Sequence, residues 1–237
     1  ALDYTVFDLS NKEKIEQELK DFSLCLNAAG PFSQTAKPMI EACIASNTHY
    51  LDITGEINVF ELAKSYGKQA TEAGICVMPG VGFDVVPSDC LANYLKENLP
   101  SATHLELAFT SIGGGLSHGT ASTMVENLGE GSAARVDGKI KKVDLGHLSK
   151  KIDFGEVKHY AMTIPWGDVS TAYTSTKIPN IVVYTGVPKR VTKMVKFQAL
   201  FNPILKTSLA KKVAQNWIDK NLYGPSAKEN QTGKSLL

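Results

Sequence analysis

The sequence has little of several residue types, and each scarcity excludes a class of protein. Its 237 residues include four cysteines, two tryptophans and two arginines. The 25 basic side chains nearly balance the 24 acidic ones, which leaves a net charge of +1 and no global attraction to nucleic acid. No stretch approaches the roughly 18 consecutive apolar residues of a membrane-spanning helix. Hydrophobic residues still make up 43% of the chain, enough for a sizeable core, so disorder is excluded.

Cysteine and histidine are scattered along the chain. The cysteines stand at positions 25, 43, 76 and 90, in apolar segments and without a CxxC pair. This pattern favours buried, reduced thiols in a cytoplasmic protein. The five histidines do not cluster with the cysteines, so the sequence predicts no metal site.

Signals for strands and helices alternate over residues 1–100. Three short apolar runs that end in turn residues predict buried strands, and apolar residues at helical spacing predict helices after them. A capping box from Ser10 to Glu13 opens a further helix over 11–21. The predicted strands cover 24–28, 49–53 and 75–78. We therefore predict an α/β fold that begins with a partial doubly wound, Rossmann-like parallel sheet and binds ligands at the carboxyl ends of its strands.

The pattern changes after residue 100. Segments rich in Val, Tyr and Thr predict strands, and helices are predicted from 120 and over 188–222, with a break at Pro203. The predicted strands cover 104–110, 157–164, 170–174 and 180–184. Residues 101–237 are therefore expected to form a second, α+β domain around a mixed or antiparallel sheet.

Both ends of the chain have the pattern of interrupted strands. Residues 4–9 are typical of the end of a strand, and 233–237 are typical of the beginning of another. We expect a fragment of a longer polypeptide, in which the strand at 24–28 has lost a neighbour. An open strand edge recruits other chains, so such a fragment is expected to self-associate as a homo-oligomer.

Two glycine-rich turns are candidate ligand loops. Gly80-Val-Gly82 lies between a strand and a helix, as in a dinucleotide-binding fingerprint, but Val85 stands at the third glycine position. We favour a tight crossover there, whose glycines still let the backbone approach a ligand. The second turn, 113–120, either binds an anion at the start of a helix or is a plain flexible loop. His118 in that turn is either a proton donor or a solvated side chain.

The segment 189–220 is basic and amphipathic. It carries eight Lys and Arg residues and one acid, a net charge of +7, together with an apolar face. Such a stretch either lies on an anionic membrane or packs against the rest of the protein, and we favour packing.

A tryptophan and a carboxylate precede a run of hydroxyl side chains. Trp166-Gly-Asp168 is followed by hydroxyl side chains up to Thr176. This run either lines a polar pocket or forms the exposed face of a sheet.

Several long blocks resemble one family of enzymes. They are Asn27-Ala-Ala-Gly-Pro-Phe32, His49 to Glu56, Pro79 to Asp89, Ile164 to Tyr173 and Ile178 to Ile181. Over nearly its whole length the chain resembles the saccharopine dehydrogenase-like oxidoreductases, which are related to the trans-acting enoyl reductases. The resemblance implies an amino-terminal Rossmann domain that binds NADP or NAD, and a substrate domain built on a mixed sheet. The family's glycine-rich pyrophosphate turn would lie before the first residue of this chain.

The resemblance also suggests roles for individual residues. The nicotinamide is expected beside Ala29, Gly30, Pro31 and Phe32, with Gly82 and Phe83 as further cofactor contacts. The expected substrate contacts are Gly114, Trp166 and Ser170. The candidate proton donors or orienting residues are Asp84, His118, Asp168 and Tyr173.

The scarcity of arginine bears on the substrate. Arg135 and Arg190 are too few for the bidentate clamps that a substrate with several carboxylates would be expected to recruit. We therefore expect reduction of an enoyl or keto group on a small or lipid-like molecule. One departure from the family pattern is Lys177, where similar proteins are expected to have Gly. The alternative function is a non-catalytic protein of the same fold that associates with a lipid or membrane surface through 189–220.

Overall fold

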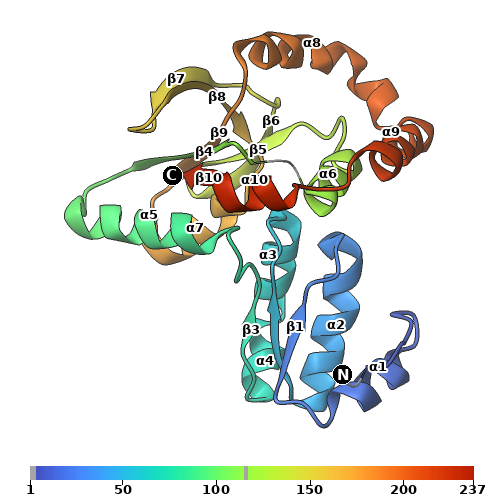
Figure 1. Ribbon diagram of the computed structural model, residues 1–237. Coiled ribbons are helices and arrows are strands. Elements are labelled where there is room, and N and C mark those ends of the chain that lie inside the picture. The colour runs from blue at the N-terminus through green and yellow to red at the C-terminus, as the bar shows by residue number, and fades with distance from the viewer. Residues whose placement is uncertain (1–3, 115–116) are drawn as a thin grey trace. The chain divides into compact units, whose positions relative to one another are not determined.

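The chain folds into two compact units, each with its own sheet (Figure 1). The computed structural model describes residues 4–114 and 117–237, and the units comprise residues 1–89 and 90–237. The predicted fold class is confirmed: a small parallel sheet is followed by a larger mixed sheet with helices.

The first unit is a parallel sheet covered by helices. Its strands pair in the order β1-β2-β3, with Asn27 of β1 opposite Asp52 of β2, and Leu51 opposite Met78 of β3. Because the strands are parallel, their carboxyl ends lie at one edge of the sheet. The elements are α1 (Lys12–Leu19), β1 (Leu24–Asn27), α2 (Phe32–Ser46), β2 (His49–Asp52), α3 (Ile57–Ser65), α4 (Gly67–Glu72) and β3 (Val77–Met78). Helix α5 (Val86–Asn98) then leads along the chain toward the second sheet.

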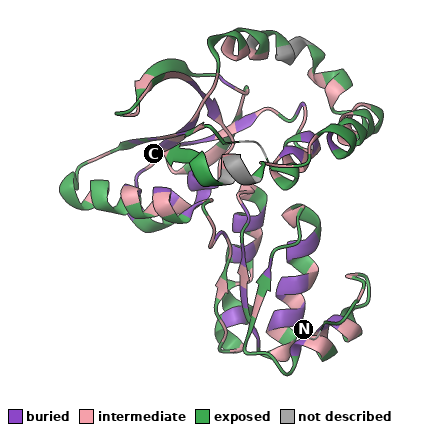
Figure 2. Ribbon diagram, viewed as in Figure 1, coloured by how far each residue is buried: buried purple, intermediate pink, exposed green. Residues whose placement is uncertain are grey.

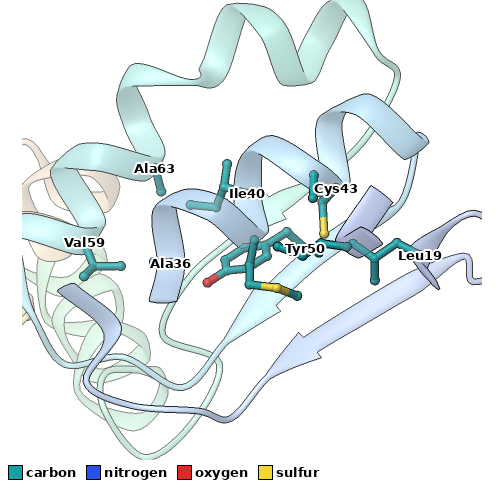
Figure 3. Packing of buried hydrophobic residues seen from close by; sticks show 10 residues of the cluster. Leu19, Ala36, Ile40, Cys43, Tyr50, Val59 and Ala63 are labelled. Atoms are coloured by element: carbon teal, nitrogen blue, oxygen red, sulfur yellow. The ribbon is translucent and has the colours of Figure 1, made fainter. Parts of the chain in front are cut away.

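Tyr50 lies in the core of the first unit (Figure 3). Helix α2 contributes Ala36, Ile40 and Cys43, which repeat at the spacing of one helix face and are fully buried. Side chains of α1 and α3 complete the cluster. This packing holds α2 against the sheet and so fixes the turn between β1 and α2.

Residues 4–9 form no strand, contrary to the sequence prediction. Tyr4 and Val6 are more than 80% exposed, while Phe7 and Leu9 pack on the core. A strand needs a partner for its backbone hydrogen bonds, and none of the described strands pairs with this segment.

The prediction of buried thiols is wrong for two of the four cysteines. Cys43 is buried and Cys25 is half-buried, but Cys76 and Cys90 are exposed. Cys76 directly precedes β3, which is an edge strand of the small sheet, so packing there covers one side only.

The second unit is built on a mixed sheet of seven strands. The central strand β9 is parallel to β4 and antiparallel to β5 and β8, and β10 adds to the free side of β4. The strands β5, β6 and β7 were not predicted; they form the hairpin β5–β6 and, with the predicted β8, the hairpin β7–β8. The strands are β4 (His104–Ile112), β5 (Ser132–Val136), β6 (Lys139–Val143), β7 (Ser149–Asp153), β8 (Lys158–Ile164), β9 (Asn180–Gly186) and β10 (Lys234–Leu236). The helices are α6 (His118–Glu126), α7 (Asp168–Thr176), α8 (Lys189–Leu205), α9 (Ser208–Asn221) and α10 (Ala227–Thr232).

The strand predicted at 170–174 is wrong, because these residues belong to helix α7. Val169, Ala172 and Thr176 are buried at helical spacing and outweigh the strand propensity of the hydroxyl side chains. Two hydroxyls are also satisfied within the helix, since Ser175 and Thr176 donate to carbonyls of the preceding turn. The helix ends at Lys177, whose φ of 59° lies in the left-handed region.

Helix α8 continues through Pro203, where the sequence predicted a break. The proline lies in the last turn of the helix, and the chain leaves helical geometry only at Thr207. There the Thr207 hydroxyl accepts a hydrogen bond from Ala210 N and starts α9.

Candidate cofactor and substrate site

A hydrogen-bonded network joins the carboxyl ends of β1 and β2. Asn27 Nδ2 donates to Thr35 Oγ1 and to the Tyr50 hydroxyl, each at 3.2 Å. The Tyr50 hydroxyl donates to Asp52 Oδ2 at 2.8 Å. All four residues are buried. Because buried polar groups without partners destabilise a fold, this network fixes the side chains at the strand ends relative to one another.

Asp52 extends the network to the end of β3. Its Oδ1 accepts hydrogen bonds from Thr54 N at 2.9 Å and from Gly80 N at 2.8 Å. Its backbone carbonyl also accepts from Val81 N at 2.8 Å. Burial raises the pKa of Asp52, and the hydrogen bonds from Thr54, Gly80 and Tyr50 oppose that rise. Asp52 therefore ties the turn after β3 to β2.

The glycines of the turn after β3 face the protein itself. A Cβ at Gly80 would lie 2.5 Å from the Phe60 ring, and the φ of Gly80 is +73°. A Cβ at Gly82 would lie 3.3 Å from Cβ of Ile53. These contacts explain both glycines as requirements of a tight crossover.

Asp84, a predicted proton donor, lies in the same turn. Its carboxyl group lies over Gly55, where a Cβ would be 2.8 Å from Asp84 Oδ2. Burial raises the pKa of Asp84 from 3.8 to about 6. Within the described part of the chain, no hydrogen bond or ion pair offsets that rise. A carboxyl group with this pKa exchanges a proton near neutral pH, as a general acid or base must.

The turn between β1 and α2 has an accessible backbone. Ala28, Ala29 and Gly30 are exposed and carry at most a methyl group. At the start of α2, Phe32 N donates to Glu56 Oε1 at 2.9 Å. A carboxylate of the protein thus occupies the position at which a helix amino terminus would bind a phosphate. The start of α2 is therefore a poor site for the pyrophosphate of a dinucleotide.

The other predicted cofactor contacts lie near these features. Pro31 precedes α2 as its N-cap residue, in extended geometry. Gly82 and Phe83 lie in the turn after β3, where the Phe83 side chain is 51% exposed. Their contact with a cofactor remains a prediction.

In the second unit, Asp168, Ser170 and Tyr173 all belong to α7. Asp168 and Ser170 are fully buried, and Asp168 stands in the first turn of the helix. Arg135, on β5, donates from Nε to Val169 O at 2.8 Å and lies 4.3 Å from the centre of the Tyr173 ring. This arginine therefore holds α7 against the sheet. Its role is one that sequence reasoning missed.

Trp166 packs on Phe109 of β4, with ring centres 4.6 Å apart. Trp166 is half-buried, and only Gly167 separates it from the start of α7. The pair is an apolar surface of the kind that a lipid-like substrate would contact.

His118 lies apart from α7, on the first turn of α6. It is exposed, and its Nε2 lies 3.0 Å from Asp219 Oδ1 of α9. Gly114 is also exposed and lies near the carboxyl-terminal segment, since a Cβ at Gly233 would be 3.3 Å from Gly114 Cα. The rest of the glycine-rich turn, Gly115 and Leu116, lies outside the described residues.

A separate hollow of about 430 Å³ lies at the ends of β4, β8 and β9. Lys158, His159 and Lys189 line it, and Thr110 Oγ1 lies 3.1 Å from His159 Nδ1. None of the sequence-predicted site residues lines this hollow.

The described residues contain neither a cluster of metal ligands nor a membrane-spanning helix. No group of three or more His, Cys, Asp or Glu side chains there could hold a metal ion. No helix there combines the length and apolar composition that are needed to cross a membrane.

Comparison with known proteins confirms the resemblance. Residues 2–78 match the family described as the saccharopine dehydrogenase NADP binding domain. A saccharopine dehydrogenase-like oxidoreductase of Rattus norvegicus is 30% identical over 111 residues, which cover 46% of this chain and 26% of the relative. A trans-acting enoyl reductase of Mycobacterium ulcerans is 31% identical over 111 residues, covering 45% of this chain and 26% of the relative.

Two further comparisons cover more of the chain. A lipid droplet localized protein of Caenorhabditis elegans is 27% identical over 159 residues, covering 65% of this chain and 36% of the relative. Apo saccharopine dehydrogenase (L-Glu forming) of Saccharomyces cerevisiae has a similar fold. The TM-score is 0.54 at 13% sequence identity, over 95% of this chain and 58% of the yeast chain. The chain thus spans about a quarter to a third of the length of these curated relatives.

Proposed function

Because residues 2–78 match the saccharopine dehydrogenase NADP binding domain family, we propose that the protein is an NADP- or NAD-dependent oxidoreductase. Its substrate would carry an enoyl or keto group on a small or lipid-like molecule. The observation that carries this proposal is Asp84, a carboxyl group with a pKa of about 6 at the carboxyl edge of a parallel sheet. Proton-transfer groups and ligands are both common at that edge.

The cofactor and the residues around it would have different roles in the reaction. A bound nicotinamide would supply a hydride to the substrate carbon. The accessible turn Ala29–Phe32 would hold the ring, and Glu56 would exclude phosphate from the start of α2. Protonated Asp84 would give its proton to the substrate oxygen of a keto group, or to the α-carbon of an enoyl group, and would be left as a carboxylate. Asp52 and Tyr50 position the turn that carries Asp84 and do not react themselves.

The choice of substrate class rests on arginine and on the aromatic pair. Arg135 is engaged with backbone carbonyls of its own unit, so it does not serve as a clamp for carboxylates. Trp166 and Phe109 offer an apolar surface instead. Two relatives, named trans-acting enoyl reductase and lipid droplet localized protein, support an acyl or lipid-like substrate.

Cofactor binding and pH dependence test the proposal. NADPH and NADH should each be titrated into the protein by calorimetry, and their oxidation followed with a panel of enoyl and keto compounds. Since protonated Asp84 is the donor, the rate should fall about tenfold per pH unit above pH 6. Asp84→Asn should abolish turnover, while the exposed Asp21→Asn should leave it unchanged. Absence of binding of both nucleotides by the full-length protein would refute the proposal.

A second candidate is a lipid-associated protein of the same fold without catalysis. It is favoured by the exposed apolar side chains of α8 and α9 and by the relative named lipid droplet localized protein. Nucleotide binding with turnover would exclude it as the sole function. Under either candidate we propose a cytoplasmic location, where an enzyme of this kind would meet nicotinamide cofactors and the outer surface of lipid structures.

A further inference from the structure

Helix α8 carries a continuous apolar stripe in solvent. Met194, Phe197, Phe201 and Ile204 are separated by three or four residues, so they lie on one face of the helix. Each of these side chains is between 55% and 69% exposed. Figure 2 shows α8 coloured largely as exposed or intermediate.

Helix α9 carries an apolar stripe of its own on a face that is not used for packing. Leu209, Val213 and Trp217 repeat every four residues and are between 62% and 72% exposed. The packed face of α9 is a different one, because Ile218 is buried against Val125 of α6. Seven large apolar side chains of two consecutive helices therefore lie in solvent, which is unusual for a surface without a partner.

Basic side chains flank the stripe on both helices. Arg190 and Lys193 each lie four residues before a stripe residue of α8, and Lys212 and Lys220 each lie three residues after one of α9. All four are exposed. They therefore project from the same side of the helices as the apolar stripe.

Asp219, the one acidic residue of the segment 189–220, contacts His118 of α6 and Gln215 of α9. Asp219 Oδ1 lies 3.0 Å from His118 Nε2 and accepts a hydrogen bond from Gln215 Nε2 at 2.8 Å. This contact ties α9 to α6. The segment 189–220 has a net charge of +7 by sequence. Lys206 pairs with Glu130 at 3.5 Å, but among the described residues none of the four basic side chains that flank the stripe forms an ion pair.

We propose that α8 and α9 dock on an anionic lipid surface, with the stripe in the headgroup and acyl boundary and the lysines at the headgroups. An extended apolar stripe with flanking Lys and Arg is the pattern of a helix that lies in such an interface. A second copy of this chain is a poor occupant, because a self-complementary contact would bring two surfaces of the same positive charge together. The proposal rests on the second candidate function and names the residues that would bind the lipid. An oxidoreductase could dock in the same way. The experiment reads lipid binding alone, so its failure would leave the nucleotide titration unaffected.

Co-sedimentation with vesicles tests the proposal. Vesicles of phosphatidylcholine with about one third phosphatidylserine should retain the protein at low salt and release it at high salt, since exposed charges are screened. Pure phosphatidylcholine vesicles should retain much less. In a Trp166→Phe background Trp217 is the only tryptophan, and its emission should shift to the blue on binding to the anionic vesicles.

Matched variants separate the apolar and the basic contributions. Phe197→Asn with Phe201→Asn should weaken binding by roughly a hundredfold, at about tenfold for each aromatic side chain withdrawn from the interface. Phe22→Asn, at an exposed phenylalanine of the first unit, is the apolar control and should have no effect. Lys212→Glu with Lys220→Glu should weaken binding at least about 25-fold, at roughly fivefold per lysine.

The charge control is Lys139→Glu with Lys141→Glu on β6, whose side chains are exposed and belong to neither helix. It should bind as the unaltered chain does. Equal recovery on neutral and anionic vesicles would overturn the proposal. So would equal loss from the two lysine pairs, or a dimer in sedimentation velocity that Phe197→Asn with Phe201→Asn dissolves.

Discussion

Asp84→Asn should make the protein more stable, and more so at higher pH. The burial of Asp84 raises its pKa in the folded state to about 6, against 3.8 in a solvated chain. The folded state therefore favours the protonated form. As pH rises from 3.8 through 6, the unfolded chain loses this proton before the folded one does, and the folded state is penalised. Asparagine has nearly the same shape and cannot ionise, so the penalty disappears in the variant.

The magnitude follows from the two pKa values. At 1.36 kcal/mol per pKa unit the penalty is about 1 kcal/mol at pH 4.5 and about 3 kcal/mol at pH 7.5. These are upper values, because the Asp84 side chain is partly exposed. The gain in unfolding free energy from Asp84→Asn should thus grow by about 2 kcal/mol over that pH interval.

Urea unfolding at the two pH values measures this difference. Circular dichroism is the suitable signal, because both tryptophans, Trp166 and Trp217, belong to the second unit. Asp21→Asn, at an exposed aspartate with the same chemistry, should change stability by the same small amount at both pH values. A gain from Asp84→Asn that does not grow with pH would refute the reasoning about burial, and with it the argument for Asp84 as a proton donor.

Three further substitutions test the network and the backbone, each by urea unfolding. Asp52→Ala leaves three buried donors without their acceptor and should destabilise the first unit by roughly 3 kcal/mol or more, whereas the isosteric Asn should lose less. Gly80→Ala places a Cβ 2.5 Å from the Phe60 ring at positive φ and should lose about 2–4 kcal/mol, whereas Gly74→Ala, with a similar φ but open space, should lose only about 1 kcal/mol. Lys177→Gly relieves a left-handed residue at the end of α7 and should gain about 0.5–1 kcal/mol. If Lys177→Gly instead destabilises the protein, the contacts of the lysine side chain stabilise the fold by more than its left-handed backbone destabilises it.

The sequence predicted the first unit well because its signals are local. Each strand is a short apolar run that ends in turn residues, and the helices repeat apolar residues on one face, as Ala36, Ile40 and Cys43 do. The strands β1, β2 and β3 lie side by side in chain order, as consecutive strands usually do. At Lys177, in the second unit, the expectation of glycine came from the family resemblance, and the φ of 59° accounts for it.

The second unit was predicted less completely because its strands depend on distant partners. Strand β6 is mostly exposed and rich in lysine, and the buried strand β5 consists of Ser, Ala, Arg and Val, so neither strand has an apolar run that would reveal the hairpin. In α7 the hydroxyl and β-branched side chains favour a strand by propensity. The burial of Val169, Ala172 and Thr176 on one face stabilises a helix by more than this propensity opposes it. Propensity alone cannot resolve such a case, but the spacing of those three residues could have done so.

The network at the strand ends was missed for a related reason. Asn27 and Asp52 are the last residues of β1 and β2, and a polar residue that ends an apolar strand is a readable signal. The contribution of Tyr50 is not readable, because a tyrosine in an apolar strand is equally typical of plain packing. Only the register, which places Asn27 opposite Asp52, brings its hydroxyl between them.

Glu56 connects this network to the kind of ligand that the turn after β1 can accept. The start of a helix carries a partial positive charge and free N–H groups, and anions bind there. In this chain the Glu56 carboxylate already accepts the hydrogen bond of Phe32 N at 2.9 Å. A phosphate at the same position would meet a negative charge and an occupied donor. An oxidised nicotinamide ring is positively charged, so the same carboxylate would stabilise it. The electrostatics of this turn therefore support the proposal that the nicotinamide end of the cofactor lies there, and that the pyrophosphate is bound elsewhere.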